Sequence, residues 1–338
     1  MTIKAPDPSR QVGFHQQLVA ARKIWLADAL AETLAKVDAR QVKEELSSLV
    51  PGDAMAILAS AGIRDEHVFP VPTVLREKPT LVGYYRLLLG SPQKTFYGSG
   101  SGMVQFKSME IDGSLTDRQK MALPEFCAAV CGALAEMVKQ MAPAVTRTDV
   151  HELPLLTLGQ QFQGANNNRI GQNATRNVFL AVKEIVGSHA VEVGKGQLAL
   201  KNASKRRVLL ALASDPDIRI EEMAAGGVPH KNVAIEIKGG TDRSNAHNRA
   251  GEAEKSHQKA KHDGFRNFWT LISLKGMKLE KLKKESPTTN EWFDIAEVLA
   301  RSGRDWDRFQ EHIAQAVGIP QRPDKRKRHN KSLVARIP

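Results

Sequence analysis

Two alternating runs on either side of Gly226-Gly227 constrain the fold of the C-terminal half more than any other feature of the chain. Ile218 and Ile220 alternate with polar residues before the glycine pair, and Val233 and Ile235 follow it. Because successive side chains of a strand point to opposite faces, a hairpin turning at the glycines sets Ile220 opposite Val233 and Ile218 opposite Ile235. This register places the four apolar side chains on one face of the hairpin.

The same register gathers ionisable side chains on the opposite face. Asp217 lies across from Glu236, and Lys238 projects from the same face as Glu236 because the two are separated by one residue. Two facing carboxylates repel each other, and a hard divalent cation with oxygen ligands is a common way to relieve that repulsion. Asp217 and Glu236 are therefore candidate metal ligands, with an ion pair on a solvated sheet face as the structural alternative.

The segment after the second run supplies further candidates. Glu252 follows Lys238 by fourteen residues, a spacing that lets a helix return its carboxylate to the sheet as another metal ligand. Arg243 and Arg249 are candidate base-contacting residues, because a guanidinium group donates two hydrogen bonds to guanine O6 and N7.

Three histidines belong to the same segment. His247, His257 and His262 lack the spacing of zinc ligands, so we expect them at the surface or in contact with phosphates.

The remaining pattern predicts a mixed α/β fold, with a mixed central sheet flanked by helices and a mainly helical N-terminal region. Strand-like runs are found after residue 190, with a long polar helix before the last of them and helices at residues 292–300 and 305–317. The runs are residues 191–200, 206–214, 217–223, 232–240 and 267–274. We expect a helical region over residues 1–150, a catalytic core over 151–320 and a basic tail over 321–338.

Helical spacing dominates the first half of the chain. Residues 15–37 predict one helix with Leu26, Leu30 and Leu34 on its buried face, and shorter helices follow at 54–63 and 123–141. Cys127 and Cys131 lie four residues apart in the last of these and are expected as reduced core thiols.

A polar stretch rich in Asn and Gln covers residues 159–177, before a short predicted helix at 175–188. We interpret it as a linker. The alternative is contact to bases, with its Asn and Gln amides matching adenine and Arg169 and Arg176 matching guanine.

The charge balance favours a polyanionic partner. The chain of 338 residues carries a formal net charge of +12, and seven basic residues against one acid in the last 18 residues supply half of it. Nucleic acid is the commonest partner for a protein of this kind. No apolar run of membrane-spanning length free of charges is present, and the N-terminus lacks the apolar core of a signal peptide, so we expect a cytoplasmic protein.

Taken together, Pro216-Asp217, Glu236-x-Lys238, Arg243-Ser244-Asn245 and Glu252 resemble the core of the PD-(D/E)XK type II restriction endonucleases. The arrangement is similar to the subgroup that cuts sites containing CCGG. Over most of the chain, including residues 83–86 (Gly-Tyr-Tyr-Arg), it is most similar to the XcyI family and its XmaI-like members.

The resemblance implies site residues and departs from the subgroup at two places. In the subgroup, an arginine-flanked motif like the one that begins at Arg243 contacts the inner guanines, and Ser244 and Asn245 belong to it. Ala246 follows Asn245 where the subgroup has arginine, so Arg249 is the alternative second contact. Glu236 stands where several members have a small residue, so whether Glu236 or Glu252 is the main second metal ligand stays open.

The resemblance also implies an activity. It implies a Mg²⁺-dependent homodimer that cuts double-stranded DNA at CCCGGG after the first cytosine, leaving a four-base 5′ overhang, with a cognate DNA methyltransferase as functional partner. Lys238 then positions the attacking water. An upstream helix glutamate contributes to such sites, and Glu184 is the candidate, with Glu192 as the alternative. Two other classes stay open, a repair or junction-resolving nuclease and a non-catalytic DNA-binding regulator with a helix-turn-helix at residues 54–69.

Overall fold

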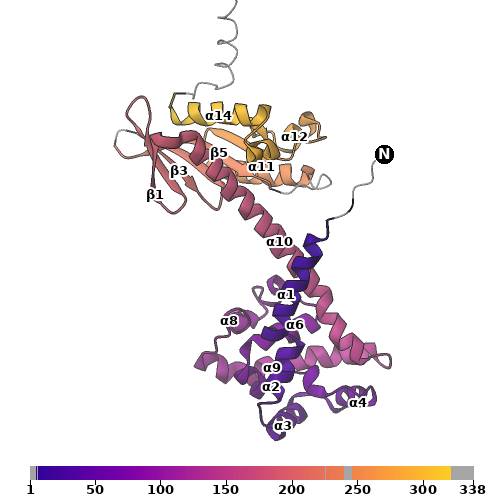
Figure 1. The fold of residues 1–338 in the computed structure, drawn as a ribbon. Helices are drawn as coiled ribbons and strands as arrows, with labels where there is room; N and C mark the ends of the chain where they lie inside the picture. The colour runs from indigo at the N-terminus through magenta and orange to yellow at the C-terminus, as the bar shows by residue number, and fades with distance from the viewer. Residues whose placement is uncertain (1–4, 6, 225, 240–245, 321–338) are drawn as a thin grey trace, which may run out of the picture. The chain divides into compact units, whose positions relative to one another are not determined.

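The computed structural model describes residue 5 and residues 7–224, 226–239 and 246–320 (Figure 1). The chain forms two compact units, residues 1–165 and residues 166–338. The first unit is helical, and the second contains a seven-stranded sheet with helices, so the predicted mixed α/β class is confirmed.

The helical unit consists of helices packed on one apolar core. Its helices are α1 (Ser9–Trp25), α2 (Ala27–Leu34), α3 (Ala39–Leu49), α4 (Gly52–Ser60), α5 (Pro72–Glu77), α6 (Val82–Leu88), α7 (Gln93–Phe96), α8 (Lys107–Asp112), α9 (Asp117–Met141) and the first part of α10 (Arg147–Val186). Short 3₁₀ turns at Asp65–His67, Pro79–Leu81 and Met103–Phe106 connect some of them.

Helix α9 is the central helix of this unit. It is long and apolar enough to cross a membrane by length and composition, but its buried stripe, with Phe126, Cys127, Val130 and Leu134, packs into the core of the unit. Such packing is what a core helix shows. Cys127 is buried as a free thiol, as is Cys131 on the same stripe, which confirms the predicted core cysteines.

The N-terminal segment differs from the single helix that the spacing predicts. The helix breaks at Leu26, whose backbone is extended (φ −107°, ψ −154°), so α1 and α2 are separate. The predicted buried face is confirmed, because Leu26 and Leu30 are buried and Leu34 packs against the same core.

The proposed helix-turn-helix is wrong. After α4, residues 65–67 form only a 3₁₀ turn, and the next helix begins at Pro72, so no recognition helix follows at the required distance.

The interpretation of residues 159–177 as a linker is also wrong, because this polar stretch belongs to α10, one helix of 40 residues. The stretch has only isolated glycines and no proline, so no residue in it breaks a helix. Downstream, Val178, Ala181, Val182 and Ile185 form a buried stripe at helical spacing that anchors α10 to the sheet.

The second unit is built on a sheet in the order β1-β2-β3-β4-β5-β6-β7 (Figure 1). Strands β1 to β5 are antiparallel neighbours, whereas β5, β6 and β7 are parallel. The strands are β1 (Ala190–Gly194), β2 (Gln197–Lys201), β3 (Arg207–Leu212), β4 (Ile218–Met223), β5 (Pro229–Ile237), β6 (Asn267–Ile272) and β7 (Glu291–Asp294). The predicted helix at 292–300 is wrong at its start, because residues 292–294 form β7 and α13 (Ile295–Ala300) follows.

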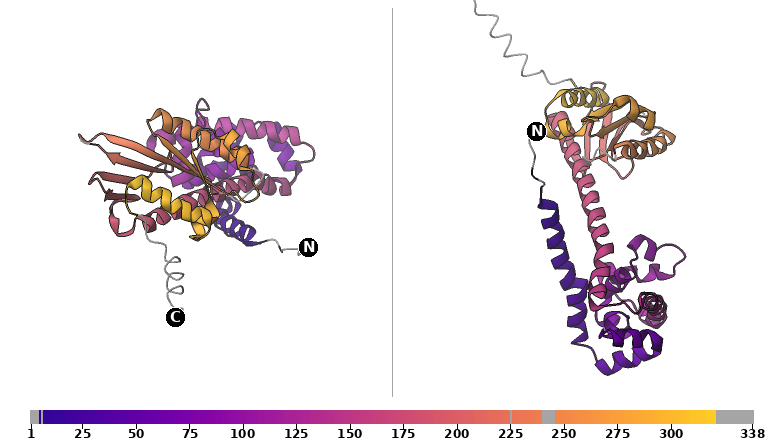
Figure 2. Two further views of the ribbon diagram at one scale, coloured as in Figure 1. Left: turned by 90° about the horizontal axis from the view of Figure 1, so that it is seen from above. Right: turned by 90° about the vertical axis from the view of Figure 1, so that its right-hand side faces the viewer.

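Helices cover both faces of the sheet. The larger apolar layer joins α10, α13 and α14 (Arg304–Val317) to the face that bears Ile218, Ile235 and Trp269. Helix α11 (Ala246–His262) connects β5 to β6 across the other face, where Ala234, Ala260 and Phe268 pack together, and α12 (Leu279–Glu285) lies next to it. Figure 2 (left) shows α14 and the helices α11 and α12 on opposite sides of the strands.

The predicted hairpin register is confirmed at the functional end of β4 and β5. Ile218 pairs with Ile235 and Ile220 with Val233. The register shifts by one residue beyond Ile220, at a bulge toward the glycine turn. The end of the hairpin that bears Asp217 and Glu236 therefore keeps the predicted parity.

A buried ion pair organises α6 in the helical unit. Arg86 is fully buried and donates through Nε and Nη2 to both carboxylate oxygens of Glu110, each at 2.8 Å. The same carboxylate accepts hydrogen bonds from Gln93 (2.6 Å) and Tyr97 (2.7 Å), and Arg86 also donates to the Ser91 carbonyl. All members of the network are paired, so it fixes the packing of α6 against α8.

We predict that Arg86→Met lowers the free energy of unfolding by about 3–5 kcal/mol, because the buried Glu110 carboxylate loses its cation. Chemical denaturation followed by circular dichroism measures this change. The control is Lys120→Ala, which removes an exposed pair with Asp117 and should change the value by at most about 1 kcal/mol. Equal values for the two variants would contradict the prediction.

Candidate active site

Asp217 is held at the junction of β4 and β5 by the backbone. Its Oδ2 accepts a hydrogen bond from the Ile237 N–H at 2.8 Å, which ties the residue before β4 to the end of β5. Its Oδ1 accepts from the Thr175 hydroxyl of α10 at 3.4 Å. The carboxylate is half-buried, so strand, helix and burial together define its position.

Glu236, Lys238 and Glu252 come together on the α11 side of the sheet. Lys238 Nζ lies 2.9 Å from Glu236 Oε1 and 3.7 Å from Glu252 Oε2. Glu236 is only 6% exposed, and its Oε2 is buried without a hydrogen-bond partner among the described residues. Glu252 projects from α11 and is exposed. The structure thus brings Asp217, Glu236, Lys238 and Glu252 into one cluster.

Burial and mutual repulsion disfavour the charges of the two inner carboxylates. Desolvation raises the pKa of Asp217, although the Ile237 N–H and Lys238 oppose it. Desolvation also raises the pKa of Glu236, and the charge of Asp217 raises it further. The pair is therefore short of positive charge, even with Lys238 present.

Lys238 carries its proton firmly. Burial lowers the pKa of Lys238, but the carboxylates of Glu236, Glu252 and Asp217 outweigh burial and raise it above its ordinary value. A protonated ammonium group donates hydrogen bonds and stabilises negative charge, and it cannot accept a proton.

These residues fit a hard divalent cation. The buried, unpartnered Oε2 of Glu236 leaves a desolvated carboxylate oxygen that a cation would pair, and the raised pKa of Asp217 and Glu236 has the same origin. Among the described residues no three acidic, His or Cys side chains already form a metal-ligand group. Asp217 and Glu236 would therefore hold a cation together with oxygens from outside this set, with Glu252 as the further protein candidate.

Gly239 brings the end of the active strand against α10. A Cβ built at this glycine would come 2.4 Å from Ala174 Cβ and 3.3 Å from the Ile170 carbonyl oxygen. Only a residue without a side chain permits this approach. The turn of α10 that contains Ala174 and Thr175 is therefore part of the site.

Four residues of the site were not among the sequence-based candidates: Thr175, Asp215, Ser256 and Lys259. Asp215 precedes Asp217 by two residues, accepts a hydrogen bond from Ser256 of α11, and pairs with Lys259 at 2.9 Å. These contacts overcome burial and lower the pKa of Asp215. They attach α11, which bears Glu252, to the start of β4. Asp215 is recognisable in the sequence as an acid next to Pro216, but its partners Ser256 and Lys259 belong to helix α11, about 40 residues further along the chain.

Other predicted residues lie apart from the cluster. Glu184 pairs with Arg301 at 3.0 Å near the C-terminal end of α10, and Glu192 pairs with Lys183 at 2.8 Å. Arg169 is exposed on α10 and donates to Asn166 at 3.0 Å.

The predicted base-contacting motif lies mostly outside the description of the structure. Arg243, Ser244 and Asn245 are not among the described residues, whereas Arg249 is half-buried in the first turns of α11.

His257 is a correction to the expected surface histidines. It is completely buried on α11, its Nε2 is 2.9 Å from Thr270 Oγ1 on β6, and burial lowers its pKa to about 4. Neutral at physiological pH, it fastens α11 to the strand beside Glu236. The position of His257 in the sequence does not indicate this burial, because its partner Thr270 belongs to β6, another element of the fold.

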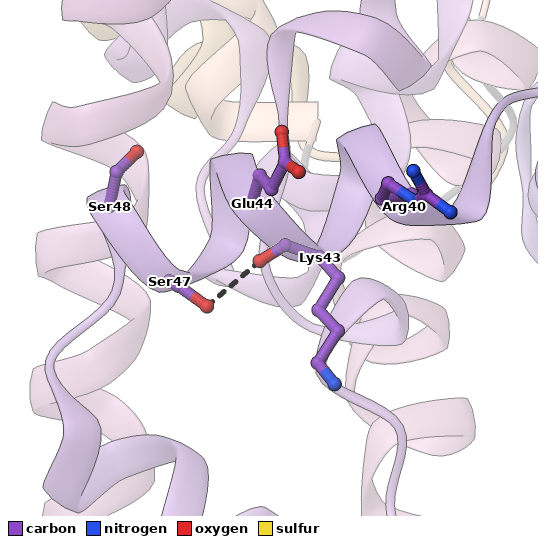
Figure 3. A pocket seen from close by; sticks show the side chains of 5 residues that line it. All are labelled: Arg40, Lys43, Glu44, Ser47 and Ser48. Atoms are coloured by element: carbon purple, nitrogen blue, oxygen red, sulfur yellow. Dashed lines mark hydrogen bonds between the residues drawn. The ribbon is translucent and has the colours of Figure 1, made fainter.

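One surface hollow lies away from the cluster of Asp217, Glu236, Lys238 and Glu252, and another lies beside it. The first, on α3, is lined by Arg40, Lys43, Glu44, Ser47 and Ser48, and its side chains belong to one exposed helix face (Figure 3). The second is lined by Asp215 and by α11 residues that include Gln258 and Lys259. Only the second adjoins the cluster.

Comparison with known proteins identifies the family. The family model described as XcyI restriction endonuclease matches residues 15–320. The chain belongs to the XcyI restriction endonuclease family. It is 38% identical to the type II restriction enzyme Cfr9I of Citrobacter freundii over 324 residues, covering 95% of this chain and 98% of that protein. It is 39% identical to the type II restriction enzyme XcyI of Xanthomonas campestris pv. cyanopsidis over 324 residues, covering 95% and 97%.

Membership confirms the resemblance found in the sequence, and this XcyI-family protein is a type II restriction enzyme, a site-specific deoxyribonuclease. The non-catalytic regulator is thereby excluded. In an XcyI-family nuclease the cluster of Asp217, Glu236, Lys238 and Glu252 is the candidate active site, because it joins acidic oxygens to a protonated lysine where β4 begins beside the end of β5.

We predict that Glu236→Gln raises the unfolding temperature in EDTA at about pH 7.5. Because the pKa of Glu236 is higher in the folded protein than its ordinary 4.5, the folded state holds its proton more tightly, and the wild-type free energy of unfolding falls as pH rises above that value. The advantage of the variant should vanish below about pH 4, where the carboxyl is protonated in both states. Thermal unfolding from pH 4 to 8 tests it.

The control is Glu280→Gln, an exposed residue of α12, which should leave the unfolding temperature unchanged across this pH series. Added Mg²⁺ should raise the unfolding temperature of the wild type more than that of Glu236→Gln. A lower unfolding temperature for Glu236→Gln in EDTA would contradict the assignment of Glu236 as an electrostatically unfavourable buried acid.

Proposed function

We propose that this XcyI-family enzyme hydrolyses double-stranded DNA at CCCGGG, after the first cytosine, to leave four-base 5′ overhangs. The observation that carries the catalytic part is the buried, unpartnered oxygen of Glu236 beside Asp217 and Lys238. The resemblance of the sequence to CCCGGG-cutting enzymes supports the site. Full-length similarity to Cfr9I and XcyI supports it further.

Mg²⁺ is the proposed cofactor, held by Asp217 and Glu236 with Glu252 as the further ligand. When bound, it supplies a Lewis acid for the scissile phosphodiester. The hydrogen bond from the Ile237 N–H to one oxygen of Asp217 fixes the position of this carboxylate before a cation binds. Glu236 can coordinate the cation through Oε2, which has no hydrogen-bond partner among the described residues.

Lys238 is the proposed positioning group for the attacking water. Its ammonium group stays protonated beside three carboxylates, so it donates to the water or to a phosphate oxygen and stabilises the charge that develops on phosphorus. Direct attack by water with inversion at phosphorus is the expected route, because Asp217, Glu236, Lys238 and Glu252 include no hydroxyl or thiol nucleophile.

Base recognition is assigned to arginines and their neighbours, because CCCGGG contains only G·C pairs and guanidinium groups match guanine. We propose Arg243 and Arg249 for the inner pairs, with Ser244 and Asn245 beside them, and Arg169 for the outer pair. Glu184 stays a candidate for a supporting acid, although its partner in this structure is Arg301.

A homodimer is the proposed assembly, since a two-fold protein matches a palindromic site and each subunit acts on one strand. The helical region, residues 1–150, is proposed to support dimerisation and DNA binding, residues 151–320 to form the catalytic core, and the basic residues 321–338 to add non-specific attraction to DNA. The proposed location is the cytoplasm, where a cognate methyltransferase protects the host sites.

We predict discrete, Mg²⁺-dependent fragments when a long duplex of known sequence is digested, and none in EDTA. Mapped ends should lie within CCCGGG. Ends at another sequence would remove the proposed specificity and keep the nuclease. Preferential cutting of forked over intact duplex would favour a junction-resolving role instead.

We predict that Lys238→Ala lowers the cleavage rate at least about 100-fold, as loss of one stabilising donor does in other active sites, while CCCGGG binding persists. Rates of single-turnover cleavage and a binding assay in EDTA separate the two effects. Lys201→Ala, at the exposed end of β2, is the control and should cut like the wild type. Full cleavage by Lys238→Ala would exclude its assigned role.

A further inference from the structure

Three polar residues of α10 form a stripe that ends at the active site. Asn168, Gln172 and Thr175 are spaced by four and three residues, so they lie within about 60° of one another around the helix. Asn168 and Gln172 are exposed, and neither side chain makes a hydrogen bond to another described residue. We name these three residues the α10 stripe.

Thr175 connects the stripe to catalysis. Its hydroxyl donates to Asp217 Oδ1 at 3.4 Å, and the neighbouring Ala174 packs against Gly239, the residue after Lys238. A scissile phosphate that reaches Asp217 and Lys238 would therefore lie next to this end of the α10 stripe.

The length of the stripe matches half of a six-base-pair site. At about 1.5 Å per residue, Asn168 lies about 10.5 Å along the helix from Thr175. That distance equals the rise of about three base pairs of B-DNA. Uncharged amides also suit base edges better than they suit phosphates, because an amide donates to guanine O6 or N7 and accepts from cytosine N4.

We propose that the α10 stripe contacts base edges next to the scissile phosphate, with Gln172 and Asn168 as specificity-determining residues and Thr175 as a positioning residue for Asp217. The inference rests on the proposed function, since it takes CCCGGG as the site. It adds uncharged contacts from a regular helix face to the proposed arginine contacts. Arg169 is outside this face, because it lies six residues before Thr175 and so about 120° away around the helix.

The test compares Asn168→Ala and Gln172→Ala with Asn173→Ala, a matched control. Asn173 is exposed on the same turn but on the opposite flank, and its side chain makes no hydrogen bond to another residue of the described part. All three substitutions introduce a strong helix former at exposed positions, so folding is retained. Binding is measured in EDTA on a CCCGGG duplex and on the same duplex with the site scrambled.

We expect each stripe variant to bind the CCCGGG duplex about tenfold more weakly than the wild type does, with scrambled-duplex affinity and the salt dependence of binding unchanged. Asn173→Ala should match the wild type. Unchanged preference in both stripe variants overturns the inference, and so does an equal loss on both duplexes, which would indicate backbone contact. If the wild type itself does not prefer CCCGGG, the proposed site is wrong, and the same comparison on the site mapped by digestion decides the inference.

Discussion

The hydrogen bond from the Ile237 N–H to Asp217 is the interaction on which the active site depends. It ties the residue before β4 to the end of β5, and strand alternation then points Glu236 and Lys238 to the α11 side while Ile235 and Ile237 enter the apolar layer. A shift of this pairing by one residue would move both ionisable groups into the core. The register bulge lies beyond Ile220, where it leaves this end of the hairpin unaffected.

Two helices converge on that junction, each by a different kind of contact. Helix α10 approaches through Gly239 and supplies the Thr175 hydroxyl. Helix α11 is attached to β6 by the buried His257–Thr270 contact and to Asp215 through Ser256 and Lys259. With both helices held, Glu252 faces Lys238, and the remaining shortage of positive charge at Asp217 and Glu236 is the property that suits a cation.

The helical unit uses ionic chemistry for a different purpose. Its Arg86–Glu110 pair is as buried as Glu236 of the active site, but every side-chain oxygen and nitrogen of the pair has a partner. A fully paired buried network specifies packing, whereas an incompletely paired one is prepared to bind. Both motifs are recognisable in the sequence, but they differ in this way. Arg86 of the Gly-Tyr-Tyr-Arg segment is fully paired and stabilises packing, whereas Glu236 of the Glu236-x-Lys238 motif keeps an oxygen without a hydrogen-bond partner among the described residues.

The sequence by itself determined the mixed α/β class, the register that pairs Ile218 with Ile235, and the gathering of Asp217, Glu236 and Lys238, because strand parity and local spacing are properties of short segments. Only the tertiary structure decided that His257 is buried and that Thr175, Asp215 and Ser256 meet the site. The physical reason is that these contacts join residues more than ten positions apart in the chain, and the periodicity of a segment does not indicate which distant segment packs against it.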